Sequence, residues 1–77
     1  MVMFRDFVRR KAKGLNLKGI VKNLKDGSVL IIAQGPESDL GSFLEIIEKG
    51  SLASRVDSIK VDWREPKEQY RGFEIKF

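Results

Sequence analysis

The sequence contains neither cysteine nor histidine among its 77 residues. Without cysteine there can be no disulfides or thiolate nucleophiles, and without histidine the usual Ser-His and Cys-His pairs are excluded as well. These two residue types also supply most ligands of zinc and other transition-metal sites, so the sequence predicts a protein that uses no metal and no cofactor. Any catalysis must therefore depend on Arg, Lys, Asn, Asp, Glu, Ser and backbone amides.

Long apolar stretches are missing too. No run of about 18 apolar residues and no secretory signal pattern is present, which favours a cytoplasmic protein with no membrane contact. The composition, 42% hydrophobic and 34% charged, predicts one small domain over residues 1–77, near the size where a single core is only marginally sufficient. The formal net charge of +4 favours anionic partners, and many Lys and Glu with few Asn and Gln are typical of proteins from hot environments.

The first half of the chain predicts a helix followed by a hairpin. Apolar residues recur at helical spacing from Phe4 to Leu15, with basic residues on the other faces, so an amphipathic helix is expected there. Two runs rich in β-branched residues follow, Lys18–Asn23 and Ser28–Gln34. They flank Asp26-Gly27, and Asp-Gly between two such runs is a strong hairpin signal.

The second half predicts a helix and two further strands. Apolar spacing predicts an amphipathic helix from Ser38 or Asp39 to Lys49. Alternation predicts a strand near Val56–Arg64, with Trp63 on its buried face, and a short final strand over Phe73–Phe77. The order α-β-β-α-β-β predicts an α+β fold in which two helices cover one face of an antiparallel sheet.

Two motifs resemble the signatures of acylphosphatases. Val2-Met3-Phe4-Arg5 with Phe7-Val8 is similar to the end of that family's phosphate-binding loop, V-x-F-R-x-F-V. Gly19–Asn23 matches its second signature, in which G-x-V-x-N leads into an Asp-Gly hairpin. Arg5 and Asn23 stand at the expected separation of eighteen positions, and the likeness extends to the closing residues Gly72–Phe77. Two signatures in the right order are much more specific than either alone.

The resemblance implies a ferredoxin-like (βαββαβ) sandwich that hydrolyses the bond between carboxyl and phosphate in a small acyl phosphate. It implies that Arg5 binds the phosphate, together with loop backbone N–H groups of Val2, Met3, Phe4 and Arg5, and that the Asn23 amide holds the attacking water. The physics agrees with these roles, because a helix N-terminus favours an anion and an arginine fork can take two phosphate oxygens. Such donors stabilise a phosphoryl-transfer transition state without a metal.

The chain departs from the family pattern at its start. Family members carry a strand and a glycine-containing loop before V-x-F-R, and here Met1 stands at the position of the loop glycine. The family order 4-1-3-2 places the missing strand between Ser28–Gln34 and the strand near Val56–Arg64. Because unpaired buried backbone groups cost about 1–3 kcal/mol each, we expect re-pairing within the monomer, or a homodimer or strand-exchanged oligomer. A shortened chain is a third reading, and fewer loop donors predict an activity that is weakened or lost.

Two other functions stay open. A non-catalytic phosphate- or acyl-phosphate-binding or regulatory module on the same fold would bind phosphate at the helix start without turnover. An RNA-binding domain is less favoured, because such sheets bind RNA through aromatic side chains on the central strands and Ser28–Gln34 has none. The basic residues Arg9, Arg10, Lys11 and Lys13 are typical of a solvated helix face.

Overall fold

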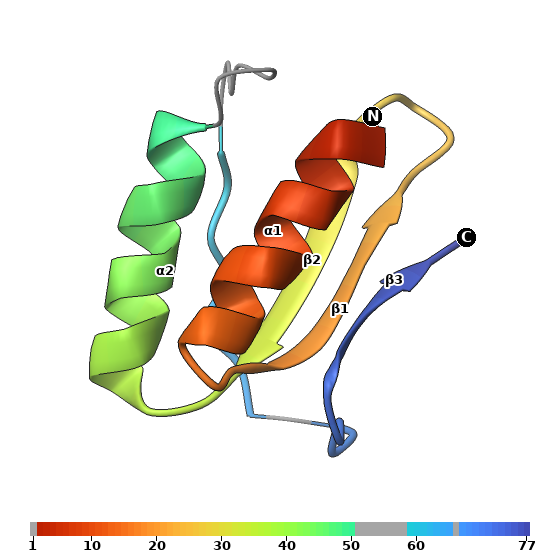
Figure 1. Cartoon of the computed structure of the whole chain (residues 1–77). Helices are drawn as coiled ribbons and strands as arrows, with labels where there is room; N and C mark the ends of the chain where they lie inside the picture. The colour runs from red at the N-terminus through yellow and green to blue at the C-terminus, as the bar shows by residue number, and fades with distance from the viewer. Residues whose placement is uncertain (1, 51–58, 66) are drawn as a thin grey trace.

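The computed structural model describes residues 2–50, 59–65 and 67–77. In chain order these residues form α1 (Val2–Gly14), β1 (Lys18–Asn23), β2 (Val29–Gln34), α2 (Glu37–Lys49) and β3 (Phe73–Lys76). Both helices cover the same face of the sheet, which gives two layers (Figure 1). The expected helices, hairpin strands and final strand are therefore confirmed to within two residues at most ends, as is the α+β class.

β1 and β2 form the predicted hairpin. They pair antiparallel, with Ile20 opposite Ile32. The turn is closed by the Leu24 N–H, which donates to the Ser28 carbonyl at 2.8 Å, and by the Gly27 N–H, which donates to the Leu24 carbonyl at 3.1 Å. Gly27 has φ 91°, in the left-handed region that glycine adopts without steric cost. The Asp-Gly signal is thus confirmed at this turn.

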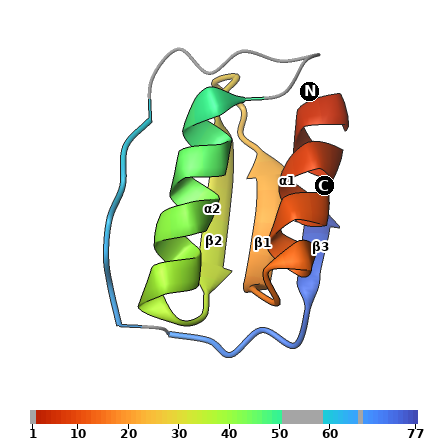
Figure 2. The ribbon, with the colours of Figure 1, turned by 60° about the vertical axis from the view of Figure 1, so that its left-hand side comes forward.

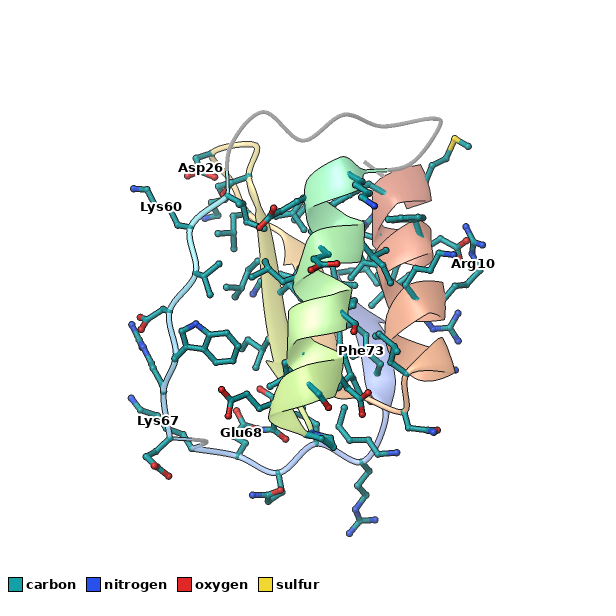
Figure 3. The ribbon with its side chains drawn as sticks, turned by 90° about the vertical axis from the view of Figure 1, so that its left-hand side faces the viewer. Arg10, Asp26, Lys60, Lys67, Glu68 and Phe73 are labelled. Carbon is teal, nitrogen blue, oxygen red and sulfur yellow. The ribbon has the colours of Figure 1, made fainter. Side chains whose placement is uncertain are left out.

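The core lies between the helices and the sheet. Both layers contribute side chains to it, and Val8 of α1 and Val21 of β1 are completely buried. Phe73 of β3 lies between the sheet and the helices and meets Phe43 of α2 edge to face, with ring centroids 6.0 Å apart (Figure 3). The buried set is Phe4, Phe7, Val8, Ala12, Leu17, Val21, Phe43, Ile47 and Phe73.

β3 extends the sheet on the far side of β1, so the strand order is β2-β1-β3. The two strands are parallel, with Gly19 opposite Phe73 and Lys22 opposite Lys76. The order of elements did not predict this parallel pairing. Its consequence for the site is direct, because both strands end at the same end of the molecule, where α1 begins (Figure 1).

Residues 59–64, the described part of the strand predicted near Val56–Arg64, do not form a strand, and residues 56–58 lie outside the described residues. The apolar side chains of residues 59–64 are open to solvent: Ile59 is 40% exposed, Val61 48% and Trp63 62%, so the interpretation of Trp63 as a core residue was wrong. The physical reason is that a strand needs a neighbour for its backbone hydrogen bonds. No strand lies between this segment and β2 in the part of the chain that the structure describes.

A cavity of about 790 Å³ separates β2 from residues 60–65. Its lining includes the β2 strand and four apolar side chains of α2, Leu40, Phe43, Leu44 and Ile47. The cavity lies on the side of β2 away from β1, where the family strand order predicted a further strand. Within the described residues, re-pairing inside the monomer does not close it.

Candidate phosphate-binding site

Three segments end or begin at one end of the molecule: α1 begins there, and β1 and β3 end there (Figures 1 and 2). Asn23 is the last residue of β1, and Phe77 follows β3. Because Lys22 lies opposite Lys76, one further step of the register sets Asn23 opposite Phe77. Arg5 of α1 completes the group through its contact with Phe77.

Arg5 is a buried cation, only 7% exposed, and it is the one buried polar or charged side chain among the described residues. Its Nε atom has no hydrogen-bond partner within the part of the chain that the structure describes. Buried charges in proteins are normally paired and hydrogen-bonded, because the loss of hydration is otherwise uncompensated. An anion beside Arg5 is the group that would supply the missing acceptor.

The guanidinium of Arg5 packs over the ring of Phe77, with Cζ 4.8 Å from the ring centroid. A cation over an aromatic face is attracted by the ring's quadrupole, by about 0.5–1 kcal/mol at an exposed site. Phe77 is 97% exposed, so the ring covers one face of the guanidinium from the solvent side. The contact orients the guanidinium plane and leaves the N–H groups at its edge available to oxygen acceptors.

The first turn of α1 carries positive potential only. It contains no acidic side chain, and its backbone N–H groups have no partner within the helix. Asp6, the first acidic residue of α1, accepts a hydrogen bond at 2.9 Å from Nε of Arg10 instead. A phosphate at this helix start would therefore meet free N–H groups and the Arg5 charge together.

The other predicted phosphate-binding residues lie in the same turn. Phe4 is buried and stacks on Phe7, with ring centroids 6.1 Å apart, whereas the Met3 side chain is 66% exposed. Phe4 thus anchors the start of the helix in the core, which holds the backbone of the turn in place. Any contribution of Val2, Met3 and Phe4 to an anion site would come from their backbone N–H groups.

Asn23 is exposed at the end of β1. Among the described residues no hydrogen bond joins its side chain to Arg5 or to the backbone of the turn. The turn is held instead by Asp26, whose Oδ1 accepts from the Ser28 hydroxyl at 2.5 Å and the Ser28 N–H at 2.9 Å. These two bonds hold the pKa of Asp26 below its usual value. The Asn23 amide is therefore free to face solvent or a ligand at the end of a rigid strand.

Sequence reasoning proposed Arg5 and Asn23 as site residues and did not consider Phe77, whose ring lies against Arg5. Alternation marked Phe77 only as part of a strand, and its contact with Arg5 depends on the parallel pairing of β3 with β1. In the residues described, there is no group of three or more His, Cys, Asp or Glu that could hold a metal ion. None of the helices described is long and apolar enough to cross a membrane.

Known proteins resemble this chain in both sequence and fold. The family model described as Acylphosphatase matches residues 1–75. The acylphosphatase of Thermotoga maritima is 46% identical over 76 residues, which cover 99% of this chain and 83% of that protein. The two matches therefore span nearly the whole chain.

Two solved structures place the fold in different contexts. The crystal structure of acylphosphatase from Bacillus subtilis has a TM-score of 0.92 and 42% identity, and the match covers 99% of this chain and 84% of that one. The crystal structure of T. kodakarensis HypF has a TM-score of 0.82 and 38% identity, over 95% of this chain but 10% of that one. The same fold thus occurs as most of a small protein and as a small part of a large one.

Proposed function

The chain belongs to the acylphosphatase family and is an acylphosphatase-like hydrolase, and we propose that it cleaves small acyl phosphates at the start of α1, using Arg5 and Asn23. One observation carries the assignment of the site. Arg5 is buried at a helix N-terminus, and its Nε has no acceptor among the described residues. A phosphoryl group supplies acceptor oxygens and negative charge at the point where both are missing.

In this proposal the phosphoryl oxygens accept hydrogen bonds from the guanidinium edge of Arg5 and from backbone N–H groups of the first turn. Two parallel N–H···O bonds from one guanidinium would fix the orientation of the phosphoryl group. Charge in the transition state spreads over the same oxygens, so donors already in place stabilise it without reorganisation. The Phe77 ring lies against one face of the guanidinium and keeps its plane in position.

Asn23 has the role of holding the attacking water. An amide can accept a hydrogen bond through its oxygen and donate through its NH₂ group, which orients a water without removing its proton. The water oxygen bonds to phosphorus and its proton passes to a phosphoryl oxygen, while the bond from phosphorus to the carboxylate oxygen breaks and the carboxylate leaves with the electron pair. Because a carboxylate is a good leaving group, positioning alone is enough to make the step fast.

The test is hydrolysis of an aromatic acyl phosphate such as benzoyl phosphate. We expect turnover above the uncatalysed rate. Arg5→Lys, which keeps the charge and removes the fork, should lower kcat by roughly 10²–10³-fold. Asn23→Ala should lower kcat while inhibition by inorganic phosphate is retained, and Arg9→Lys on the same helix should change neither. Full activity in the Arg5 variant would remove this site from the reaction.

The second candidate is a phosphate- or acyl-phosphate-binding module without turnover. The match to HypF favours it, because there a domain of this fold makes up 10% of a longer chain. Isothermal titration with inorganic phosphate separates the two functions. Binding that depends on Arg5, without hydrolysis of any acyl phosphate tested, would support the module and reject the enzyme.

The proposal includes two broader features. The cytoplasmic location expected from the sequence is part of it. So is association of two chains through the outer edge of β2, which pairs with no other strand among the described residues. The second feature is supported by the position of β2 at the edge of the sheet and by the apolar residues of α2 that line the adjacent cavity.

A further inference from the structure

The tip of the β1–β2 turn carries a chemically labile pair, Asp26-Gly27, and we propose that it is a site of isoaspartate formation whose rate is set by Ser28. Glycine follows no other aspartate in the sequence. In isoaspartate the backbone continues through the side-chain carbon Cγ instead of the main-chain carbonyl carbon. The proposal does not rest on acyl phosphate hydrolysis, because it concerns the chemistry of the turn itself.

The rearrangement needs only these two residues and water. The backbone nitrogen of Gly27 bonds to Cγ of Asp26, and one carboxyl oxygen leaves as water with the amide proton and the carboxyl proton. The product is a cyclic imide. Water then adds at the main-chain carbonyl carbon of Asp26 and breaks its bond to the Gly27 nitrogen, which leaves isoaspartate with a free carboxyl group. Addition of water at Cγ instead restores the original residue.

The turn leaves the reacting atoms open. Residues 23–28 are exposed to solvent, and Asp26 lies at the tip of the hairpin (Figure 3). Gly27 has no side chain to obstruct the approach of its own nitrogen, and even an added Cβ there would meet nothing within 4 Å. No described residue therefore crowds the Gly27 side of the turn, and the rate depends on how the turn holds the two reacting groups.

Ser28 holds the carboxyl group of Asp26 in its less reactive form. The hydroxyl and the N–H of Ser28 both donate to Oδ1 of Asp26, at 2.5 Å and 2.9 Å. These bonds favour the ionised carboxylate, and the hydroxyl first and the N–H second keep the pKa of Asp26 below its usual value. A carboxylate is a poor electrophile, because its charge repels the incoming nitrogen and the departing oxygen needs a proton. The two bonds therefore slow the first step.

The Gly27 nitrogen is restrained as well. Its N–H donates to the Leu24 carbonyl at 3.1 Å. The nitrogen attacks only after its proton is lost, so this bond must break before the imide forms. A second bond, from the Leu24 N–H to the Ser28 carbonyl at 2.8 Å, closes the same turn. Both reacting groups are thus held by hydrogen bonds of the turn, and the reaction proceeds when the turn opens locally.

Isoaspartate adds one atom to the backbone of this tight turn. The turn joins Asn23 at the end of β1 to Val29 at the start of β2, and these two residues lie opposite each other. A longer path at residue 26 displaces the Ser28 carbonyl from the Leu24 N–H, so we expect this end of the hairpin to loosen. Asn23 would then lose the fixed position on which its proposed role depends.

Peptide mapping of the aged chain tests the site. The folded chain and a peptide of residues 20–32 are kept at neutral pH and the same temperature, below the melting temperature of the chain. Isoaspartate is measured as a peptide of unchanged mass and altered retention, and the imide as a species lighter by one water. We expect isoaspartate at residue 26, forming roughly ten- to hundred-fold more slowly in the folded chain than in the peptide. Equal rates, or an aged chain that rearranges only at other residues, would overturn the proposal.

Variants at Ser28 test what sets the rate. Ser28→Ala removes the hydroxyl bond, so isoaspartate should form roughly three- to ten-fold faster in the folded chain, the equivalent of one hydrogen bond. Ser28→Thr keeps a hydroxyl and should react as slowly as the original chain, as should Ser38→Ala in α2, the control outside the turn. In urea that unfolds the chain, Ser28→Ala and the original should react equally, because the fold supplies the protection. An unchanged rate in folded Ser28→Ala, or an equal acceleration in urea, would reject the role of Ser28.

Discussion

Arg5 combines two unfavourable features that a folded protein rarely accepts in one residue. Its cation is buried with Nε unpaired among the described residues, and it lies in the first turn of α1, where the helix dipole also repels positive charge. Neither feature helps the chain to fold. Both become favourable when an anion occupies the proposed site, so the proposal predicts that Arg5 contributes to binding at the expense of stability.

This conflict predicts that Arg5→Met stabilises the protein in the absence of phosphate. Replacement of a buried, unpaired charge by an apolar side chain of similar length is often stabilising, and we expect about 1–2 kcal/mol in the free energy of unfolding. Urea denaturation in a phosphate-free buffer measures it. A loss of stability would mean that the folded chain already compensates the Arg5 charge, and would weaken the case for an anion site.

Phe77 is predicted to hold the guanidinium in its binding orientation. Phe77→Leu keeps an apolar side chain and removes the ring, so the affinity for inorganic phosphate should fall about two- to five-fold, the equivalent of about 0.5–1 kcal/mol. Calorimetric titration measures this change. Phe77→Tyr retains the ring face and should bind phosphate like the original chain; if it binds as poorly as the leucine variant, the aromatic face is not what matters.

At the scale of elements, the β1–β2 turn contributes a pH-dependent stability. The Ser28 hydroxyl first, and its N–H second, lower the pKa of Asp26 below 3.8 in the folded chain. A lowered carboxyl pKa contributes stability that is present above pH 3.8 and lost as the pH falls through the folded value. Ser28→Ala should raise the pKa of Asp26, as measured by NMR titration, whereas Ser38→Ala in α2 should leave it unchanged.

Gly19 is predicted to be essential to the β1–β2 pairing. It has φ 151°, and an added Cβ would lie 1.7 Å from the Ile32 carbonyl oxygen. Gly19→Ala should therefore reduce the free energy of unfolding by about 2–4 kcal/mol through backbone strain and overpacking. Gly14→Ala is the control, because a Cβ there has no neighbour within 4 Å. Equal stability of the two variants in thermal denaturation would contradict this packing.

The elements that sequence reasoning predicted are those whose signals are local. Helix periodicity and the Asp-Gly turn act over a few residues, so α1, α2 and the hairpin were predicted close to their observed bounds. Residues 59–65 carry an equally regular alternation, yet a strand also needs a neighbour to pair with. They have none among the described residues, and alternation carries no information about that. The Arg5–Phe77 contact belongs to the same class, because it arises from the pairing of strands distant in sequence.

At the scale of the whole molecule, part of the helix layer has no strand beneath it among the described residues. Leu40 and Leu44 of α2 are only partly buried and line the cavity beside β2. A domain of this size has a total stability of only about 5–15 kcal/mol, so each partly buried side chain matters. Binding at the phosphate site should therefore be visible as a change in the stability of the entire chain.

Inorganic phosphate, as a product of the proposed reaction, is expected to raise the melting temperature. A ligand at ten times its Kd stabilises the folded state by about 1.4 kcal/mol, which in a domain of this size corresponds to roughly 6–11 °C. Differential scanning calorimetry should show this shift, and sodium chloride at matched ionic strength should not reproduce it. In Arg5→Met the phosphate-dependent shift should vanish although the variant starts from a higher melting temperature. An undiminished shift in that variant would place the phosphate away from α1. Loss of the shift would link the stability of the whole fold to Arg5, whose Nε is the buried side-chain donor that has no partner among the described residues.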